Sequence, residues 1–162
     1  MTDGQPVRRG ARPSLVDHAL RVTATAEDGG RVIGTYDFGS LRCGPALQST
    51  LAHAFANRVD VGGEWRSEWT MRSAFQGLVA FVRWADDHEQ RYETVESITP
   101  ALYDSYTLSL RPSVDAGRHA YTRALLLDLE GLREDTRVRV DRRAKRYKPS
   151  QMEGLSLSLI HI

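Results

Sequence analysis

The 162-residue sequence predicts an all-α protein, a small helical bundle with an extended N-terminal leader and a basic C-terminal linker. Three observations predict this class. Apolar residues recur every three or four positions in four separate segments, which is the period of an amphipathic helix. A Pro, Ser or Thr of the kind that begins helices stands at the start of each segment. Only one short stretch has the alternation of a strand, and a single strand has no partner.

The first 30 residues predict disorder rather than a folded element. They are rich in Gly, Pro, Arg and Asp, with only brief apolar stretches such as Leu15–Val16. The Asp-Gly-Gly turn at residues 28–30 is expected to end this segment. Residues 31–38, RVIGTYDF, have roughly alternating apolar side chains, so they form either a short strand or an extended segment.

The first helix is predicted over residues 45–59, with Pro45 at its start. With residues 31–38 it makes up a leader over residues 31–63, which the glycines at 62 and 63 terminate. The core-facing side chains of this helix recur at helical spacing: Leu47, Leu51, Ala54, Phe55 and Val59.

Three helices follow in a predicted helical domain, residues 64–136. The longest runs from about residue 70 to 89, with either Thr70 or Ser67 as its N-cap. Its apolar stripe consists of Met71, Phe75, Leu78, Val82 and Ala85, widened by Ala74, Phe81 and Trp84. The next helix begins with Thr99 as N-cap and Pro100 at its first position, and it ends at residues 111–112.

The last predicted helix has Ser113 as its N-cap and continues to about residue 134. Gly117 weakens it near its beginning. Its core-facing residues are Tyr121, Leu125, Leu129 and Leu132.

Charge is distributed unevenly along the chain. The net charge is only +1, but residues 137–148, RVRVDRRAKRYK, contain seven Lys or Arg against one Asp. We expect residues 137–150 to form an extended basic linker. Such a segment fits either a polyanionic partner or a solvated, disordered connection.

Several classes of function are disfavoured by what the sequence lacks. Cys43 is the only cysteine, so no internal disulfide or zinc spacing exists. The five histidines are scattered, and no phosphate-binding glycine loop is present. The N-terminus does not resemble a signal peptide, and no apolar run could span a membrane. We therefore expect a cytoplasmic protein without metal, cofactor, membrane or small-molecule ligand.

The order of the sequence motifs from Trp65 onward reduces the number of protein families that the chain could resemble. A long helix carries F-x-x-W at Phe81 and Trp84, the sequence ITP opens the next helix, and a leucine-rich helix follows. A basic segment then leads to Y-x-P at Tyr147–Pro149. This order resembles the SAM-like core-binding domain of tyrosine recombinases, the phage-integrase family, over roughly residues 31–150.

The resemblance implies a DNA-binding arm that clamps double-stranded DNA together with a catalytic domain. In that family the catalytic domain supplies Arg, Lys, His and Arg residues and the attacking tyrosine, and the recombinase assembles as a tetramer on paired DNA sites. None of these catalytic residues can be assigned here, because no HxxR motif follows the basic segment, where the catalytic domain would begin. Tyr147 lies in the linker and does not correspond to the nucleophile. We expect the chain itself to bind DNA and to cut nothing.

Two groups of residues are predicted to contact DNA. The first is the basic segment: Arg137, Arg139, Arg142, Arg143, Lys145, Arg146 and Lys148. The second lies near helix starts, where amide groups favour phosphate: Thr70, Arg72, Arg111, Ser113, Arg118, His119 and Thr122. Each has a structural interpretation as well. Thr70 fits an ordinary N-cap, Arg118 and Thr122 fit a solvated face opposite the leucines, and His119 fits a surface residue.

Residues 151–162 are expected to be the truncated start of a catalytic domain followed by a foreign tail. The last six residues, LSLIHI, match the translation of an adapter used in transposase-based sequencing libraries. A native hydrophobic C-terminus is the alternative.

Two other functions compete with the recombinase arm. One is a helical protein-interaction module whose basic tail is incidental. The other is a small DNA-binding regulator, which needs a recognition helix that the sequence does not reveal.

Overall fold

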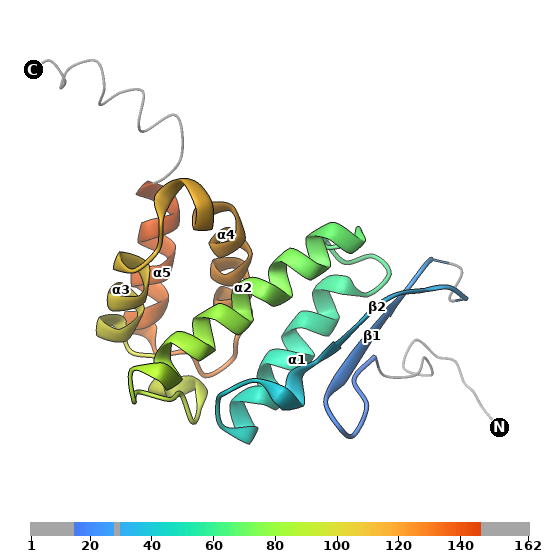
Figure 1. Cartoon of the computed structure of the whole chain (residues 1–162), viewed down its shortest axis with the longest axis horizontal. Coiled ribbons are helices and arrows are strands. Elements are labelled where there is room, and N and C mark those ends of the chain that lie inside the picture. Colours follow the sequence, from blue (N-terminus) through green and yellow to red (C-terminus); the bar gives the residue numbers. More distant parts are fainter. Residues whose placement is uncertain (1–14, 28–29, 147–162) are drawn as a thin grey trace, which may run out of the picture.

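The computed structural model describes residues 15–27 and 30–146, with side chains as far as Arg142. This part of the chain is mostly helical and includes a two-stranded sheet (Figure 1). Its main elements are β1 Arg21–Thr25, β2 Val32–Asp37, α1 Pro45–Val59, α2 Glu68–Asp87, α3 Pro100–Leu108, α4 Pro112–Asp128 and α5 Glu134–Arg146. The hairpin lies at one end of the molecule and α3–α5 at the other, with α1 and α2 between them. The predicted helical class is confirmed in this coarse form, but the fold is not purely α.

The N-terminal hairpin corrects the prediction that residues 1–30 are largely disordered. Strand β1 pairs antiparallel with β2 from Arg21 opposite Asp37 to Ala24 opposite Gly34. The alternating side chains of Val22 and Ala24 are fully buried. Residues 31–38 therefore do have a partner, supplied by a segment whose composition gave little sign of it. Residues 1–14 and the turn residues 28–29 lie outside the described part.

An aromatic cluster attaches the hairpin to the helices. Tyr36 near the end of β2 and Phe38 just after it meet Phe55 of α1 and Phe75 of α2, with ring centroids 5.1–5.3 Å apart. Trp65 extends the cluster to Tyr121 of α4 in an edge-to-face contact at 5.6 Å. Each such contact contributes about 0.5–1.5 kcal/mol beyond simple burial. The cluster therefore joins the hairpin, α1, α2 and α4 into one core.

The central helices begin where capping chemistry predicts. Pro45 is the first residue of α1, and its predicted bounds are confirmed. Ser67 rather than Thr70 is the N-cap of α2, because the Ser67 hydroxyl accepts a hydrogen bond from the Thr70 amide at 3.1 Å. Thr99 caps α3 in the same way, through the Leu102 amide at 3.2 Å.

Helix α4 differs from its predicted bounds at both ends. Arg111 occupies the N-cap position, so Ser113 lies in the first turn instead of capping the helix. The helix ends at Asp128, and Leu129 and Leu132 are buried in the following turn. These two leucines continue the helical spacing of the core-facing residues of α4, but they reach the core from a loop.

Helix α5 overturns the prediction of an extended basic linker. Residues 134–146 form a helix whose first half packs on the bundle. The buried Thr136 hydroxyl donates to the Ile98 carbonyl at 2.7 Å, and Val140 is fully buried. The guanidinium of Arg137 donates to the Leu127 and Leu129 carbonyls at 2.6 and 2.9 Å, and Arg139 forms an ion pair with Asp104. These contacts are made by only a few side chains, so the polar composition of the segment concealed them.

Candidate nucleic-acid interface

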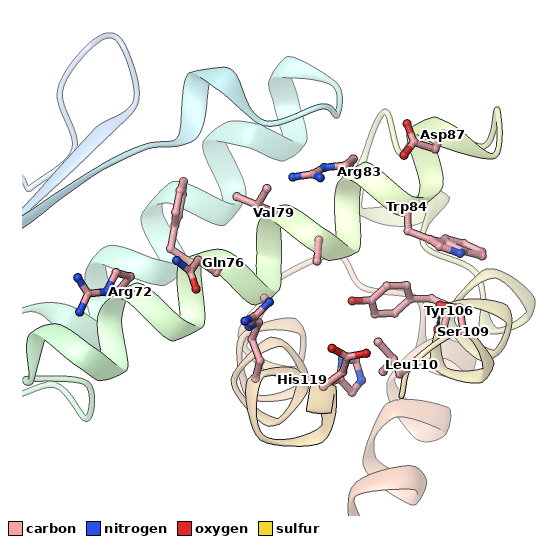
Figure 2. Close-up of a pocket in the computed structure, with 15 residues that line it drawn as sticks. Arg72, Gln76, Val79, Arg83, Trp84, Asp87, Tyr106, Ser109, Leu110 and His119 are labelled. Atoms are coloured by element: carbon pink, nitrogen blue, oxygen red, sulfur yellow. Dashed lines mark hydrogen bonds between the residues drawn. The ribbon is translucent and has the colours of Figure 1, made fainter. Parts of the chain in front are cut away.

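A groove runs between α2 and the beginning of α4 and is closed at one end by the last turn of α3 (Figure 2). Its volume is about 670 Å³. Three arginines line it, Arg72 and Arg83 from α2 and Arg118 from α4. Sequence reasoning predicted Arg72 and Arg118 as DNA contacts, and the structure brings both to one groove.

The α2 wall of the groove is a single stripe of the helix. Arg72, Gln76, Val79, Arg83 and Asp87 follow one another at three- and four-residue steps, and all line the groove. Arg72, Gln76 and Arg83 are exposed. Arg83 was not among the predicted contacts, although its helical spacing from Arg72 would have placed it on the same face.

The position of Arg118 depends on an unusually close helix crossing. Gly77 of α2 is buried beneath α4, and a Cβ atom added there would lie 2.8 Å from Arg118 Cγ and 2.9 Å from the Arg118 carbonyl oxygen. A glycine inside a helix costs about 1 kcal/mol of stability relative to alanine. The close packing at the crossing offsets this low helix propensity. Gly77 thus seats the stem of Arg118 directly on α2.

The two carboxylates in the groove are already bound to arginines. Asp87 pairs with Arg42 at 3.1 Å. Asp115 receives both the Arg111 side chain, at 3.2 and 3.3 Å, and the Arg111 amide, at 2.8 Å. Hydrogen bonds from the Arg111 side chain and amide hold the pKa of Asp115 below its usual value. Asp115 therefore stays charged at neutral pH, and Arg111 balances its charge.

The groove arginines have weak or no counterions. Arg72 approaches Glu68 at 3.7 Å, but both side chains are more than half exposed, and such pairs contribute little. Within residues 15–27 and 30–142, neither Arg83 nor Arg118 forms an ion pair, although the charge of Arg118 also helps to lower the pKa of Asp115. The groove consequently presents more positive than negative charge, which suits an anionic partner.

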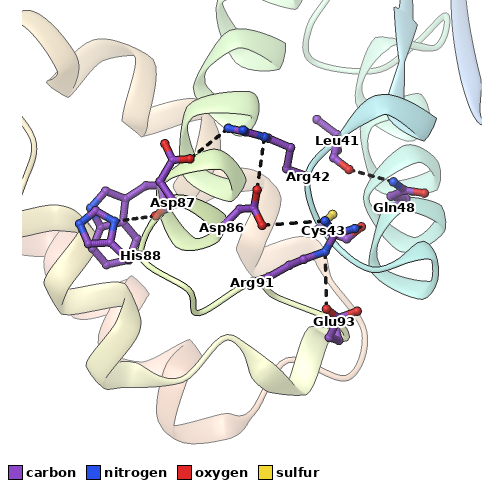
Figure 3. A network of polar contacts seen from close by, with 10 residues as sticks. Leu41, Arg42, Cys43, Gln48, Asp86, Asp87, His88, Arg91 and Glu93 are labelled. Atoms are coloured by element: carbon purple, nitrogen blue, oxygen red, sulfur yellow. Dashed lines mark hydrogen bonds and ion pairs between the residues drawn. The ribbon is translucent and has the colours of Figure 1, made fainter.

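A polar network holds the chain against the C-terminal end of α2 (Figure 3). Arg42 bridges Asp86 and Asp87 at 3.3 and 3.1 Å. Arg91 approaches Asp86 and Glu93 at 3.9 and 3.5 Å, and it donates to the Cys43 carbonyl at 3.0 Å. Both carboxylates therefore bind Arg42, which belongs to the segment that precedes α1.

Two predicted contacts are core residues. His119 was expected at the surface but is only 6 % exposed, and its Nε2 lies 3.0 Å from the Tyr103 hydroxyl oxygen. Thr122 was expected on a solvated face but is 1 % exposed at the Gly77 crossing. Helical spacing alone misplaced them, because α2 covers Thr122 and the Tyr103 and Tyr106 rings of α3 cover His119.

The other predicted contacts are dispersed. Thr70 and Ser113 do not line the groove, and the Thr70 amide is occupied by the Ser67 cap. Arg111 is held by Asp115, and Arg137 and Arg139 are held by the bundle. Arg142 is exposed on α5. The structure gives only the helical backbone of Arg143, Lys145 and Arg146, and Lys148 lies outside the described residues.

Cys43 is fully buried, and burial raises the pKa of its thiol to about 12, so the thiol stays protonated at neutral pH. Between residues 15 and 146, positions 28–29 aside, no group of three His, Cys, Asp or Glu side chains is arranged to hold a metal ion. No helix in this portion combines the length and apolarity needed to cross a bilayer.

Comparisons with known proteins add no information about the groove. No family model, curated protein or solved structure matches the chain.

Proposed function

We propose that this chain is a DNA-binding helical domain of the tyrosine-recombinase type, and that the α2–α4 groove contacts the sugar–phosphate backbone of duplex DNA. One observation carries the proposal. Three exposed arginines from two crossing helices line one groove, while the acidic side chains beside them are already paired.

Arginines in this setting suit phosphate recognition. A guanidinium group offers several N–H donors in a planar fork and remains charged at any physiological pH. Contacts to phosphates position a protein on DNA without reading sequence. Two arginines on one helix and a third on a crossing helix span more than one phosphate. In this proposal the groove provides affinity for the DNA backbone, and it does not select a base sequence.

The end of α5 is a second candidate contact. Arg142 is exposed, and Arg143, Lys145 and Arg146 continue the same helix. Only this distal part of the basic segment is proposed to meet DNA, because Arg137 and Arg139 are bound by the bundle. Strand cleavage and assembly of a tetramer on paired sites would belong to the catalytic domain that the resemblance implies.

Fluorescence anisotropy with a labelled duplex tests the groove. The triple variant Arg72→Gln, Arg83→Gln, Arg118→Gln is expected to bind on the order of tenfold more weakly at low salt. The slope of log affinity against log salt should fall by about 3, or about 1 for each lost phosphate contact.

A matched triple variant controls for net charge. Arg21, Arg31 and Arg133 are exposed and do not line the groove, and their replacement by Gln removes the same three charges. This variant should keep most of the affinity. Equal losses in the two triple variants would show that overall charge, rather than the groove, binds DNA. Salt-independent binding would reject the proposal altogether.

A protein-interaction module remains the second candidate because two large apolar side chains are exposed. Leu108 at the end of α3 and Val114 at the start of α4 are 79 % and 57 % exposed. Sedimentation velocity of the full chain and of a Leu108→Ser, Val114→Ser variant tests self-association through these side chains. Concentration-dependent association that the variant loses supports this function, whereas a monomer at every concentration argues against it.

A further inference from the structure

A second hollow, about 450 Å³ in volume, lies between α3 and the N-terminal half of α4. It is separate from the DNA groove except that His119 and Leu110 border both. Small-molecule sites in proteins typically occupy 300–1,000 Å³ and combine apolar walls with a few polar groups. The hollow has the size and, as its lining shows, the composition of such a site.

The lining divides into an apolar part and a polar part. Leu110, Pro112 and Ala116 supply apolar surface. The buried pair of Tyr103 and His119, 3.0 Å apart, supplies polar groups that are already ordered. Because the two rings fix each other, a ligand that meets them does not have to order them first.

The charge of the hollow is set by Arg123. Arg111 also lines it, but Asp115 neutralises that guanidinium with two hydrogen bonds. Arg123 is half-buried and forms no ion pair with any residue in the described part of the chain. One uncompensated guanidinium beside an apolar wall complements a single negative charge attached to an apolar body.

Two small residues of α4, Ala116 and Gly117, line the hollow. A Cβ atom added at Gly117 would meet nothing within 4 Å. No close contact or positive φ requires this glycine, unlike Gly77 at the helix crossing. Gly117 therefore lowers the stability of α4 without serving helix packing, and the missing side chain leaves space at the hollow.

We propose that this hollow binds a small monocarboxylate with an aromatic or branched aliphatic body. Its carboxylate binds Arg123, and its body lies on Leu110, Pro112 and Ala116. The sequence carried no signature of this site and led us to expect no small-molecule ligand, because its residues come from two helices and no motif joins them. The inference does not depend on DNA binding.

NMR titration of the full ¹⁵N-labelled chain with phenylacetate and with 4-methylpentanoate tests the proposal. At least one of the two acids should give saturable shifts in the amides of Gly117 and Arg123. The corresponding amide, phenylacetamide or 4-methylpentanamide, should bind at least fivefold more weakly because it has no charge. Arg123→Gln should weaken binding of the acid by a similar factor.

Two ring-adding variants locate the site. Ala116→Phe places a ring within the hollow and should abolish binding, whereas Ala120→Phe makes the same substitution at an exposed position outside it and should leave affinity within twofold. The Arg72, Arg83, Arg118 triple variant should bind the acid normally, so failure of the DNA proposal is distinguishable from failure of this one. Shifts that never saturate with either acid, or equal affinity for acid and amide, would overturn the inference.

Discussion

Arginines serve opposite purposes in two regions of this molecule. In the seam where α1, α4 and α5 meet, their donors are used by the protein itself. Arg58 binds Asp128 at 2.6 and 3.2 Å and Glu64 at 2.6 Å, and its guanidinium carbon lies 5.0 Å from the centre of the Trp65 ring. Arg137 binds two carbonyls at the end of α4. In the α2–α4 groove, by contrast, Arg83 and Arg118 have no such acceptors among the described residues.

The comparison teaches that arginine content alone does not locate a nucleic-acid surface. A guanidinium whose donors are all occupied by fixed acceptors contributes to stability, and freeing it for a phosphate would cost those bonds. A guanidinium without counterions contributes little to stability and is available to a ligand. The two regions should therefore respond to mutation in different assays.

The largest expected effect is on the seam. Arg58→Ala should lower the free energy of unfolding by about 2 kcal/mol, because charge-assisted hydrogen bonds and a cation–π contact are lost together. The side chain is only 19 % exposed, so solvent replaces these interactions poorly. Arg72→Ala in the groove is the control and should change stability by less than about 0.5 kcal/mol. Urea denaturation measures both, and equal losses would remove the distinction between the regions.

A smaller effect is expected at the crossing that holds Arg118 in the groove. Gly77→Ala should destabilise the protein by about 1–2 kcal/mol, since the added methyl meets the α4 backbone and overpacking outweighs the gain in helix propensity. Gly117→Ala should have the opposite sign, a gain of up to about 1 kcal/mol, because its methyl meets open space. Thermal unfolding of the two variants measures both effects. Stabilisation by both substitutions would mean that the crossing is looser than described.

The smallest expected effect is the pH dependence of the Asp115–Arg111 pair beside the groove. The pKa of Asp115 is lowered in the folded state, so its contribution to stability is complete above the unfolded value, about 4, and is lost as pH falls below it. Asp115→Asn should therefore lose less stability than the natural chain between pH 5 and pH 3. The Arg111 side chain is largely exposed, so solvent screens the pair and only the sign is predicted. Parallel slopes for the two proteins would contradict it.

Local signals predicted the helices that begin with Pro45 and Thr99, and the long helix α2, because capping and apolar period act over a few residues. They failed for β1 and α5. The two buried residues of β1 stand in a polar, glycine-rich region, and their partner strand begins seven residues later. In α5, among the side chains described as far as Arg142, the buried ones are a threonine and a valine that stand between charged residues.

The candidate site was predicted only in part. Arg72 and Arg118 were identified from their positions near helix starts, but no sequence pattern distinguishes them from Arg137 and Arg139, which the bundle binds. The difference lies in which acceptors the fold brings near each guanidinium. Asp104 reaches Arg139 across 35 positions of the chain, and Asp128 reaches Arg58 across 70. No local window contains both members of such a pair.

The sequence by itself determined where α1 and α3 begin and which faces of α1 and α2 are apolar, because helix starts and helical spacing are properties of neighbouring residues. Only the tertiary structure decided that a polar N-terminal stretch forms a strand, that the basic segment becomes a helix, and that three arginines meet in one groove. Those outcomes depend on contacts between residues far apart in the chain, and burial and pairing at such contacts outweigh local preference.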